Sequence, residues 1–380
     1  MTDRRIFIKQ LFATVLSWHI PGAGDLASQA WSGTPTAAYM HCNSLQPCTT
    51  LPASAILYTY INGPDIKKAD FLPAVGYLAN DHIIDTLFDS FLFLPSPRFL
   101  NAGGLRELKK NDWQAYIDNW QFAKGVNLDA LEAAVDDVQA ALGRRFKVNV
   151  FMTVFPPVST VASFGEVNGK DMNFAVLDDR KTAIKWMVDE QIRQFNERNF
   201  KNLQLAGFYW HLESLTVLKT DPQMWDVIKY FTDYIRQRGY KTVWTPYHRA
   251  PGWDKGKELG FDLLTMQANY FPARPKAPNA GPVSRLAENA EKTKSLGYGV
   301  QMEIHGKVSE EAAITGFKQY MKYGVELGYM NNDYNSYYMN FGPETVRGLY
   351  DSTDFYTRET YCNLYAFIKR TLKIADIHTQ

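Results

Sequence analysis

After residue 54 the chain alternates between short apolar runs and longer amphipathic segments. Runs rich in β-branched and aromatic residues are typical of buried parallel strands, and amphipathic segments between them are typical of crossover helices. Eight runs occur, at residues 56–61, 83–95, 147–156, 203–213, 242–248, 261–270, 299–305 and 329–334. The pattern predicts an α/β protein with a (β/α)8 TIM barrel, formed by one domain over residues 55–375.

The segments between the runs show helical periodicity. Leu128, Leu131, Val135, Val138 and Leu142 recur at helical spacing, and a glycine that can end a helix follows them. This spacing predicts a helix over residues 128–142. Further helices are predicted over residues 178–200, 224–238, 283–296 and 312–327, and the last three are each followed closely by a glycine.

The N-terminal segment has the features of an export signal. Arg4 and Arg5 precede a moderately apolar stretch that reaches Ile20, and small residues near Ala30 would permit cleavage. Residues 1–30 therefore resemble a twin-arginine signal, with residues 31–54 as a linker and a periplasmic or extracellular destination. The alternative is a cytosolic protein with a basic, apolar start. No later apolar stretch is long enough to span a membrane, so no other membrane insertion is expected.

Cysteine and histidine spacings give no sign of a metal centre. Cys42 and Cys48 are close enough for a small disulfide loop in an oxidising compartment, which would leave Cys362 unpaired. The chain has no CxxC motif and no HxH or HxxxH spacing, so neither a metal nor another cofactor is predicted.

Charge and aromatic content narrow the class of partner. Lys and Arg number 41 against 40 Asp and Glu, which argues against nucleic-acid binding through a broad basic surface. Aromatic residues make up 14% of the chain, which fits either an aromatic-rich core or an aromatic-lined cleft.

Two glutamates lie at or near the ends of predicted strands. Glu213 ends the fourth run, and Glu303 lies between Met302 and Ile304 near the end of the seventh. TIM-barrel active sites lie at the carboxyl ends of the strands, and a carboxylate among apolar residues is costly unless it has a partner. Two carboxyl groups across a barrel mouth can serve as proton donor and nucleophile in glycoside hydrolysis. The structural alternative for each is a salt bridge at the rim.

These positions resemble those of retaining glycoside hydrolases of the large TIM-barrel clan. The resemblance implies that Glu213 is the acid/base and Glu303 the nucleophile, although Leu212 stands where that clan has an asparagine. The chain also looks like a bacterial family of secreted proteins known only as a domain of unknown function, over most of residues 55–340. The segments that carry this likeness are residues 89–94, 207–214, 244–247 and 267–270. That family is associated with glycoside-hydrolase-like barrels, which implies the architecture more than the activity.

Other residues near predicted strand exits are candidates for contacts with sugars. Aromatic side chains offer flat apolar faces to a sugar ring, and polar side chains can bind its hydroxyl groups. These candidates are Asp89, Trp210, His211, Trp244, Tyr247, His248, Gln267, Asn269, Tyr270 and His305. The alternative for each is structural, namely core packing for the aromatic residues and loop capping for Asp89.

The leading hypothesis is a secreted glycoside hydrolase that acts on a polysaccharide or glycoconjugate through Glu213 and Glu303. It would be retaining if the two carboxyl groups lie about 5–5.5 Å apart, and inverting if they lie about 6.5–9.5 Å apart. A non-catalytic carbohydrate-binding barrel of a glycan-utilisation system fits the aromatic strand exits equally well. A metal-dependent hydrolase that uses His211, His248 and His305 is a third, weaker hypothesis.

Overall fold

A computed structural model describes residues 54–61, 65–95 and 108–378. The predicted signal, nearly all of the predicted linker, Cys42 and Cys48 lie outside the described residues. Among the described helices, none combines the length and the apolar character that crossing a membrane requires.

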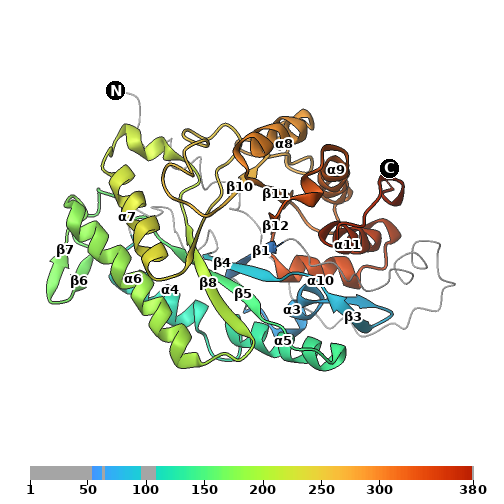
Figure 1. Cartoon of the computed structure of the whole chain (residues 1–380), viewed down its shortest axis with the longest axis horizontal. Helices are drawn as coiled ribbons and strands as arrows, with labels where there is room; N and C mark the ends of the chain where they lie inside the picture. The colour runs from blue at the N-terminus through green and yellow to red at the C-terminus, as the bar shows by residue number, and fades with distance from the viewer. Residues whose placement is uncertain (1–53, 62–64, 96–107, 379–380) are drawn as a thin grey trace.

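Eight parallel strands close into a barrel (Figure 1) in the order β1, β12, β11, β10, β9, β8, β5, β4. The sheet closes because β1 pairs with β12 on one side and with β4 on the other. The (β/α)8 TIM-barrel fold predicted from the sequence is thereby confirmed. The strands are β1 (Ser54–Ile61), β4 (Ser90–Pro95), β5 (Val148–Val154), β8 (Leu203–Trp210), β9 (Lys241–Trp244), β10 (Leu263–Gln267), β11 (Gly299–Ile304) and β12 (Tyr334–Met339).

Helices surround these strands (Figure 1). They are α3 (Lys68–Val75), α4 (Lys110–Tyr116), α5 (Leu128–Leu142), α6 (Leu177–Arg198), α7 (Met224–Gln237), α8 (Ser284–Leu296), α9 (Glu311–Leu327), α10 (Pro343–Asp351) and α11 (Phe355–Ile368). Helix α5 has the predicted bounds, and α6 to α9 lie within two residues of their predictions. Residues 245–262, all of them described, connect β9 to β10 without a helix.

Two predicted strands are placed differently in the structure. The run 83–95 divides into β3 (His82–Thr86), antiparallel to β2 (Gly76–Ala79), and the barrel strand β4. The eighth strand begins only at Tyr334, because residues 329–331 form a 3-10 turn instead. Gly328 has a φ of 90° there, and Asn335 Nδ2 donates to the carbonyl of Tyr329 at 2.9 Å, which holds the turn closed. A second hairpin joins β6 (Gly165–Val167) to β7 (Lys170–Met172) between β5 and α6.

The inside of the barrel is filled by side chains that alternate along the strands. Tyr58 and Tyr209 lie there in an apolar cluster with Ile56, Leu92, Leu94, Phe151 and Val243. A chain of hydrogen-bonded hydroxyl groups runs through the same space from β1 to β12. The Tyr58 hydroxyl bonds to that of Thr245, which bonds to Thr265 at 2.9 Å, and Thr265 bonds to Ser336 at 2.8 Å. Since these polar groups satisfy one another, the interior forms a packed floor beneath the strand exits.

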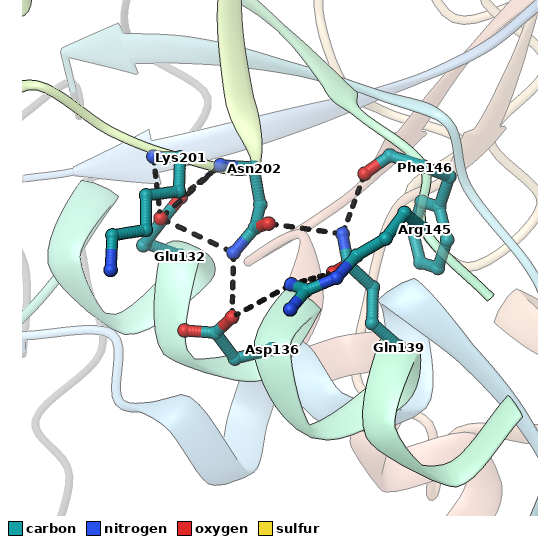
Figure 2. Close-up of polar contacts among 7 residues, drawn as sticks. All are labelled: Glu132, Asp136, Gln139, Arg145, Phe146, Lys201 and Asn202. Atoms are coloured by element: carbon teal, nitrogen blue, oxygen red, sulfur yellow. Dashed lines mark hydrogen bonds and ion pairs between the residues drawn. The ribbon is translucent and has the colours of Figure 1, made fainter. Parts of the chain in front are cut away.

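At the end where the strands begin, a polar network joins α5 to the starts of β5 and β8 (Figure 2). Glu132 accepts the backbone N–H of Asn202 at 3.2 Å, and Asn202 Nδ2 donates to Asp136 at 2.8 Å. Gln139 Nε2 donates both to Asn202 Oδ1 at 3.1 Å and to the carbonyl of Phe146 at 2.6 Å. Asn202 is buried, so its amide depends on these partners.

We expect the Asn202→Ala substitution to lower the free energy of unfolding by about 1–3 kcal/mol, because it removes a buried amide and leaves the buried amide of Gln139 with one partner fewer. Urea denaturation followed by tryptophan fluorescence measures the change. Lys201→Ala is the matched control, since Lys201 is exposed and contributes its backbone N–H to the network. Equal losses of stability in the two variants would contradict the role of the Asn202 side chain.

Candidate active site

Polar side chains gather where β8, β10 and β11 end. In a closed parallel barrel all strand exits lie at the same rim, so residues far apart in the sequence meet there. The predicted residues at these exits are His211, Glu213, Gln267, Asn269, Glu303 and His305.

A β-bulge sets the direction of the residues that follow β8. Val150 pairs with Leu205 and Phe151 pairs with Gly207, so Ala206 is an extra residue in β8. Gly207 also permits close packing against β9, because a Cβ there would lie 2.1 Å from the carbonyl oxygen of Lys241. Beyond the bulge Tyr209 points into the barrel interior.

Glu303 is a buried carboxylate held by two donors, with a histidine beside its second oxygen. Its side chain is 2% exposed, and its Oε2 accepts the backbone N–H of Asn269 at 2.9 Å and the hydroxyl of Tyr320 at 2.8 Å. His305 Nε2 lies 3.3 Å from the other oxygen, Oε1. Burial and the charge of Glu303 raise the pKa of Tyr320 well above its ordinary value, so this phenol remains a donor. These contacts fix both oxygens of Glu303 in position.

Glu213 has a different environment from Glu303. Burial raises the pKa of its carboxyl group to about 7; a hydrogen bond with Gln267 opposes this shift, and the charge of Glu303 adds to it. Glu213 is therefore protonated in slightly acidic solution, with a charged carboxylate near enough to influence it. Two neighbouring carboxyl groups with environments that separate their protonation are typical of acid/base pairs.

Tyrosines that the sequence analysis did not single out surround the two glutamates. Tyr60 on β1 and Tyr338 on β12 are half-buried and meet edge to face, with ring centroids 5.8 Å apart. The ring of His305 stacks on Tyr338 at 4.5 Å. The pKa values of Tyr60 and Tyr338 are raised, mainly by burial and in part by the negative charge of Glu213. Both rings therefore lie within electrostatic reach of the glutamates at the barrel mouth.

His211 has unused hydrogen-bonding capacity at this rim. Its ring packs edge-on to Phe155 and Tyr209, and in the described part of the chain neither ring nitrogen has a hydrogen-bond partner. Burial lowers the pKa of His211 to about 4, so the imidazole is neutral near pH 7. A neutral imidazole can donate one hydrogen bond and accept another, which suits a hydroxyl group.

Four further candidates lie beside this centre. The Nδ2 of Asn269 donates to the Oε1 of Gln267 at 3.2 Å, so these two predicted residues are in contact. Tyr247 forms an isolated parallel bridge with Gln267 and is half-buried. Tyr270 is half-buried as well, and its backbone N–H donates to the hydroxyl of Tyr320 at 3.3 Å.

Asp89 was predicted to contact sugar, and this is wrong because it lies at the opposite end of the barrel. It comes directly before β4 rather than after a strand. Its Oδ1 accepts the backbone N–H of Ala55 at 2.9 Å and the hydroxyl of Ser90 at 2.8 Å. Asp89 therefore fixes the starts of two strands.

Trp210 and Trp244 are also excluded as platforms for sugar. Both are fully buried between the barrel and its helices, where Trp210 packs on Phe231 and Trp244 stacks on Phe261. The Nε1 of Trp244 donates to the carbonyl of Leu212, which supports the segment before Glu213. The predicted contact of these two residues with a sugar is wrong, because side chains alternate along a strand and both rings point toward the surrounding helices instead of the barrel interior.

His248 is turned toward α8, and its predicted contact with a sugar stays a prediction. Its buried ring lies 3.3 Å from Glu288 on α8. Among the described residues no group of three or more His, Cys, Asp or Glu is arranged to hold a metal ion. Cys362 is disulfide-bonded, so the prediction that it is unpaired is wrong; the other two cysteines lie outside the described residues.

The fold and the site together define a (β/α)8 barrel with paired glutamates at the exits of β8 and β11. The chain belongs to the family described as Domain of unknown function (DUF4855), which matches residues 56–366. The resemblance to a family of unknown function is thus confirmed. No curated protein matches the chain.

Several solved structures are similar to the chain at very low sequence identity. Amy13B of Eubacterium rectale is 10% identical with a TM-score of 0.44, over 83% of this chain and 72% of that one. The chitinase ChiW from Paenibacillus sp. str. FPU-7 is 8% identical with a TM-score of 0.43, over 84% of this chain and 33% of the chitinase. An alpha-amylase from H. orenii is 10% identical with a TM-score of 0.40, over 77% and 71%.

Proposed function

We propose that the protein is a retaining glycoside hydrolase in which Glu213 is the acid/base and Glu303 the nucleophile. One observation carries the proposal. The pKa of Glu213 is raised to about 7, in part by the charge of Glu303, and Glu303 is held by hydrogen-bond donors from Asn269 and Tyr320. The two come from β8 and β11, at the end of the barrel where TIM-barrel enzymes carry their active sites.

In the first step, protonated Glu213 gives its proton to the glycosidic oxygen while a Glu303 oxygen attacks the anomeric carbon. The bond to the leaving sugar breaks, and a covalent ester forms on Glu303. In the second step, Glu213 takes a proton from water, whose oxygen attacks the anomeric carbon and releases Glu303 as a carboxylate. The two inversions give retention of configuration.

The electrostatic coupling between the glutamates suits this sequence of steps. The negative charge of Glu303 contributes to the raised pKa of Glu213, which favours the acid form before the first step. Once Glu303 is esterified its charge is gone, so the pKa of Glu213 falls and Glu213 becomes the base that the second step needs.

The surroundings of the pair suit a sugar ring. Tyr338 and Tyr60 present half-buried aromatic faces, and His211 offers a neutral imidazole with free bonding capacity. Aromatic faces pack well against the apolar side of a ring, while polar groups orient its hydroxyls. On the N-terminal sequence we also propose that the enzyme is exported and acts on a polysaccharide or glycoconjugate.

We expect Glu213→Gln and Glu303→Gln each to reduce hydrolysis by at least about 100-fold, because each removes an acid/base or nucleophilic group. Release of reducing ends from a panel of neutral and acidic polysaccharides measures it. Glu344→Gln is the matched control, since burial likewise raises the pKa of Glu344 to about 7, but its charged neighbours are Asp70 and Arg347.

Wild-type rates in both glutamine variants would contradict the proposal. If no polysaccharide of the panel is cleaved while the Glu213→Gln variant binds one of them as tightly as the wild type does, the barrel is a carbohydrate-binding protein without turnover.

We expect Tyr320→Phe to lower kcat by about 10- to 100-fold, since a hydrogen bond to a charged group contributes about 1.5–3 kcal/mol. The substitution removes the hydroxyl that donates to Glu303 and leaves the buried ring in place. Steady-state kinetics should show the loss mainly in kcat, with melting temperature as the control for folding. An unchanged kcat would show that Tyr320 does not position Glu303.

A further inference from the structure

The loop after β9 lies between the two glutamates at the rim. The carbonyl of Pro251 accepts the backbone N–H of Leu215, two residues beyond Glu213, at 2.8 Å. On the other side, the backbone N–H of His248 donates to Asn269 Oδ1 at 3.0 Å. Because Asn269 itself donates to Glu303, residues 247–253 are tied to the exits of both β8 and β11.

This loop and the adjoining face of α8 carry an excess of positive charge. Arg249 adopts a left-handed backbone with φ of 64°, and its side chain is 68% exposed. Its Nη2 lies 3.5 Å from Glu288, which shares one face of α8 with Arg285 and Lys292 at spacings of three and four residues. Lys292 is held over the ring of Trp253, with its Nζ 4.8 Å from the centroid. Three cations thus face one carboxylate.

Repulsion among these cations contributes to their pKa values. Burial lowers the pKa of both Arg285 and Lys292, and the nearby charge of Arg249 lowers them further. A bound anion would relieve this repulsion, which the charge of Glu288 offsets in part.

His248 adds a buried polar group beside the cations. It is 2% exposed, and within the part of the chain that the structure describes its Nδ1 has no hydrogen-bond partner. Its Nε2 faces Glu288 at 3.3 Å. Burial lowers the pKa of His248 to about 4, so a neutral imidazole lies next to the cationic cluster near pH 7.

We propose that Arg249, Arg285 and Lys292 form a subsite for an acidic sugar, which carries a carboxylate or a sulfate group. Guanidinium groups bind such anions through paired hydrogen bonds, and the ammonium group adds a further positive charge. This inference rests on the proposed function and specifies its substrate class: a glycan that carries anionic residues. It also gives His248 a role, as the buried group that supports the loop bearing Arg249.

The test measures binding to the full-length Glu213→Gln variant by isothermal titration calorimetry. The probes are oligogalacturonate for the carboxylate, dextran sulfate for the sulfate, neutral dextran, and polyglutamate as an anion without sugar. We expect one acidic glycan to bind at least about tenfold more tightly than dextran, with an affinity that falls as salt rises. Adding Arg249→Gln should reduce that affinity about tenfold, whereas the control Arg236→Gln, which removes an exposed charge on α7, should leave it unchanged.

Whichever acidic glycan binds identifies the anionic group. The subsite is overturned if neither binds, if polyglutamate binds equally well, or if Arg249→Gln has no more effect than Arg236→Gln. These results are separable from the proposed chemistry. If the protein hydrolyses a neutral glycan, Glu303→Gln abolishes this hydrolysis and no acidic glycan binds, the subsite is contradicted and the hydrolase is retained. If an acidic glycan binds through Arg249 but no glycan is hydrolysed, the hydrolase is contradicted and the subsite is retained.

Discussion

Closure of the parallel sheet through β1 is the constraint on which the site depends. Since β1 pairs with both β4 and β12, all eight strands end at a single rim. Tyr60, Glu213, Glu303 and Tyr338 are far apart in the sequence, and closure brings their strands together. The hydroxyl chain from Tyr58 to Ser336 and the apolar cluster around it fill the space below. A packed floor of this kind lets the rim hold charged groups in fixed positions.

The two glutamates differ because their partners differ. Glu303 receives an N–H from Asn269 and a hydroxyl from Tyr320, which are supplied by the loop after β10 and by α9. Glu213 has Gln267 as its hydrogen-bonding neighbour, and burial dominates its pKa. Asn269 is central, because its backbone holds Glu303 while its side chain holds both Gln267 and the loop after β9. The same residue thus links Glu303 to the loop that bears Arg249 of the cationic cluster.

Much of the architecture could be predicted from the sequence. Apolar runs and helical periodicity located the strands and most helices, and acidic residues in apolar strands pointed to Glu213 and Glu303. The errors have physical causes. Strand alternation puts Tyr209 inside the barrel and so turns Trp210 outward, which the aromatic content alone did not reveal. The eighth strand was placed too early, so Tyr338 was missed. Tyr320 lies on a helix, and no local pattern shows that its hydroxyl reaches a strand.

The most direct test of the account is an NMR titration of the side-chain carboxyl group of Glu213 in the wild-type protein and in Glu303→Gln. We expect a pKa of about 7 in the wild type, because burial and the charge of Glu303 both disfavour ionisation of Glu213. The pKa should be lower in the variant, which lacks that charge. A wild-type pKa near the ordinary value of about 4.3, or one that Glu303→Gln does not change, would contradict the coupled pair and the chemistry built on it.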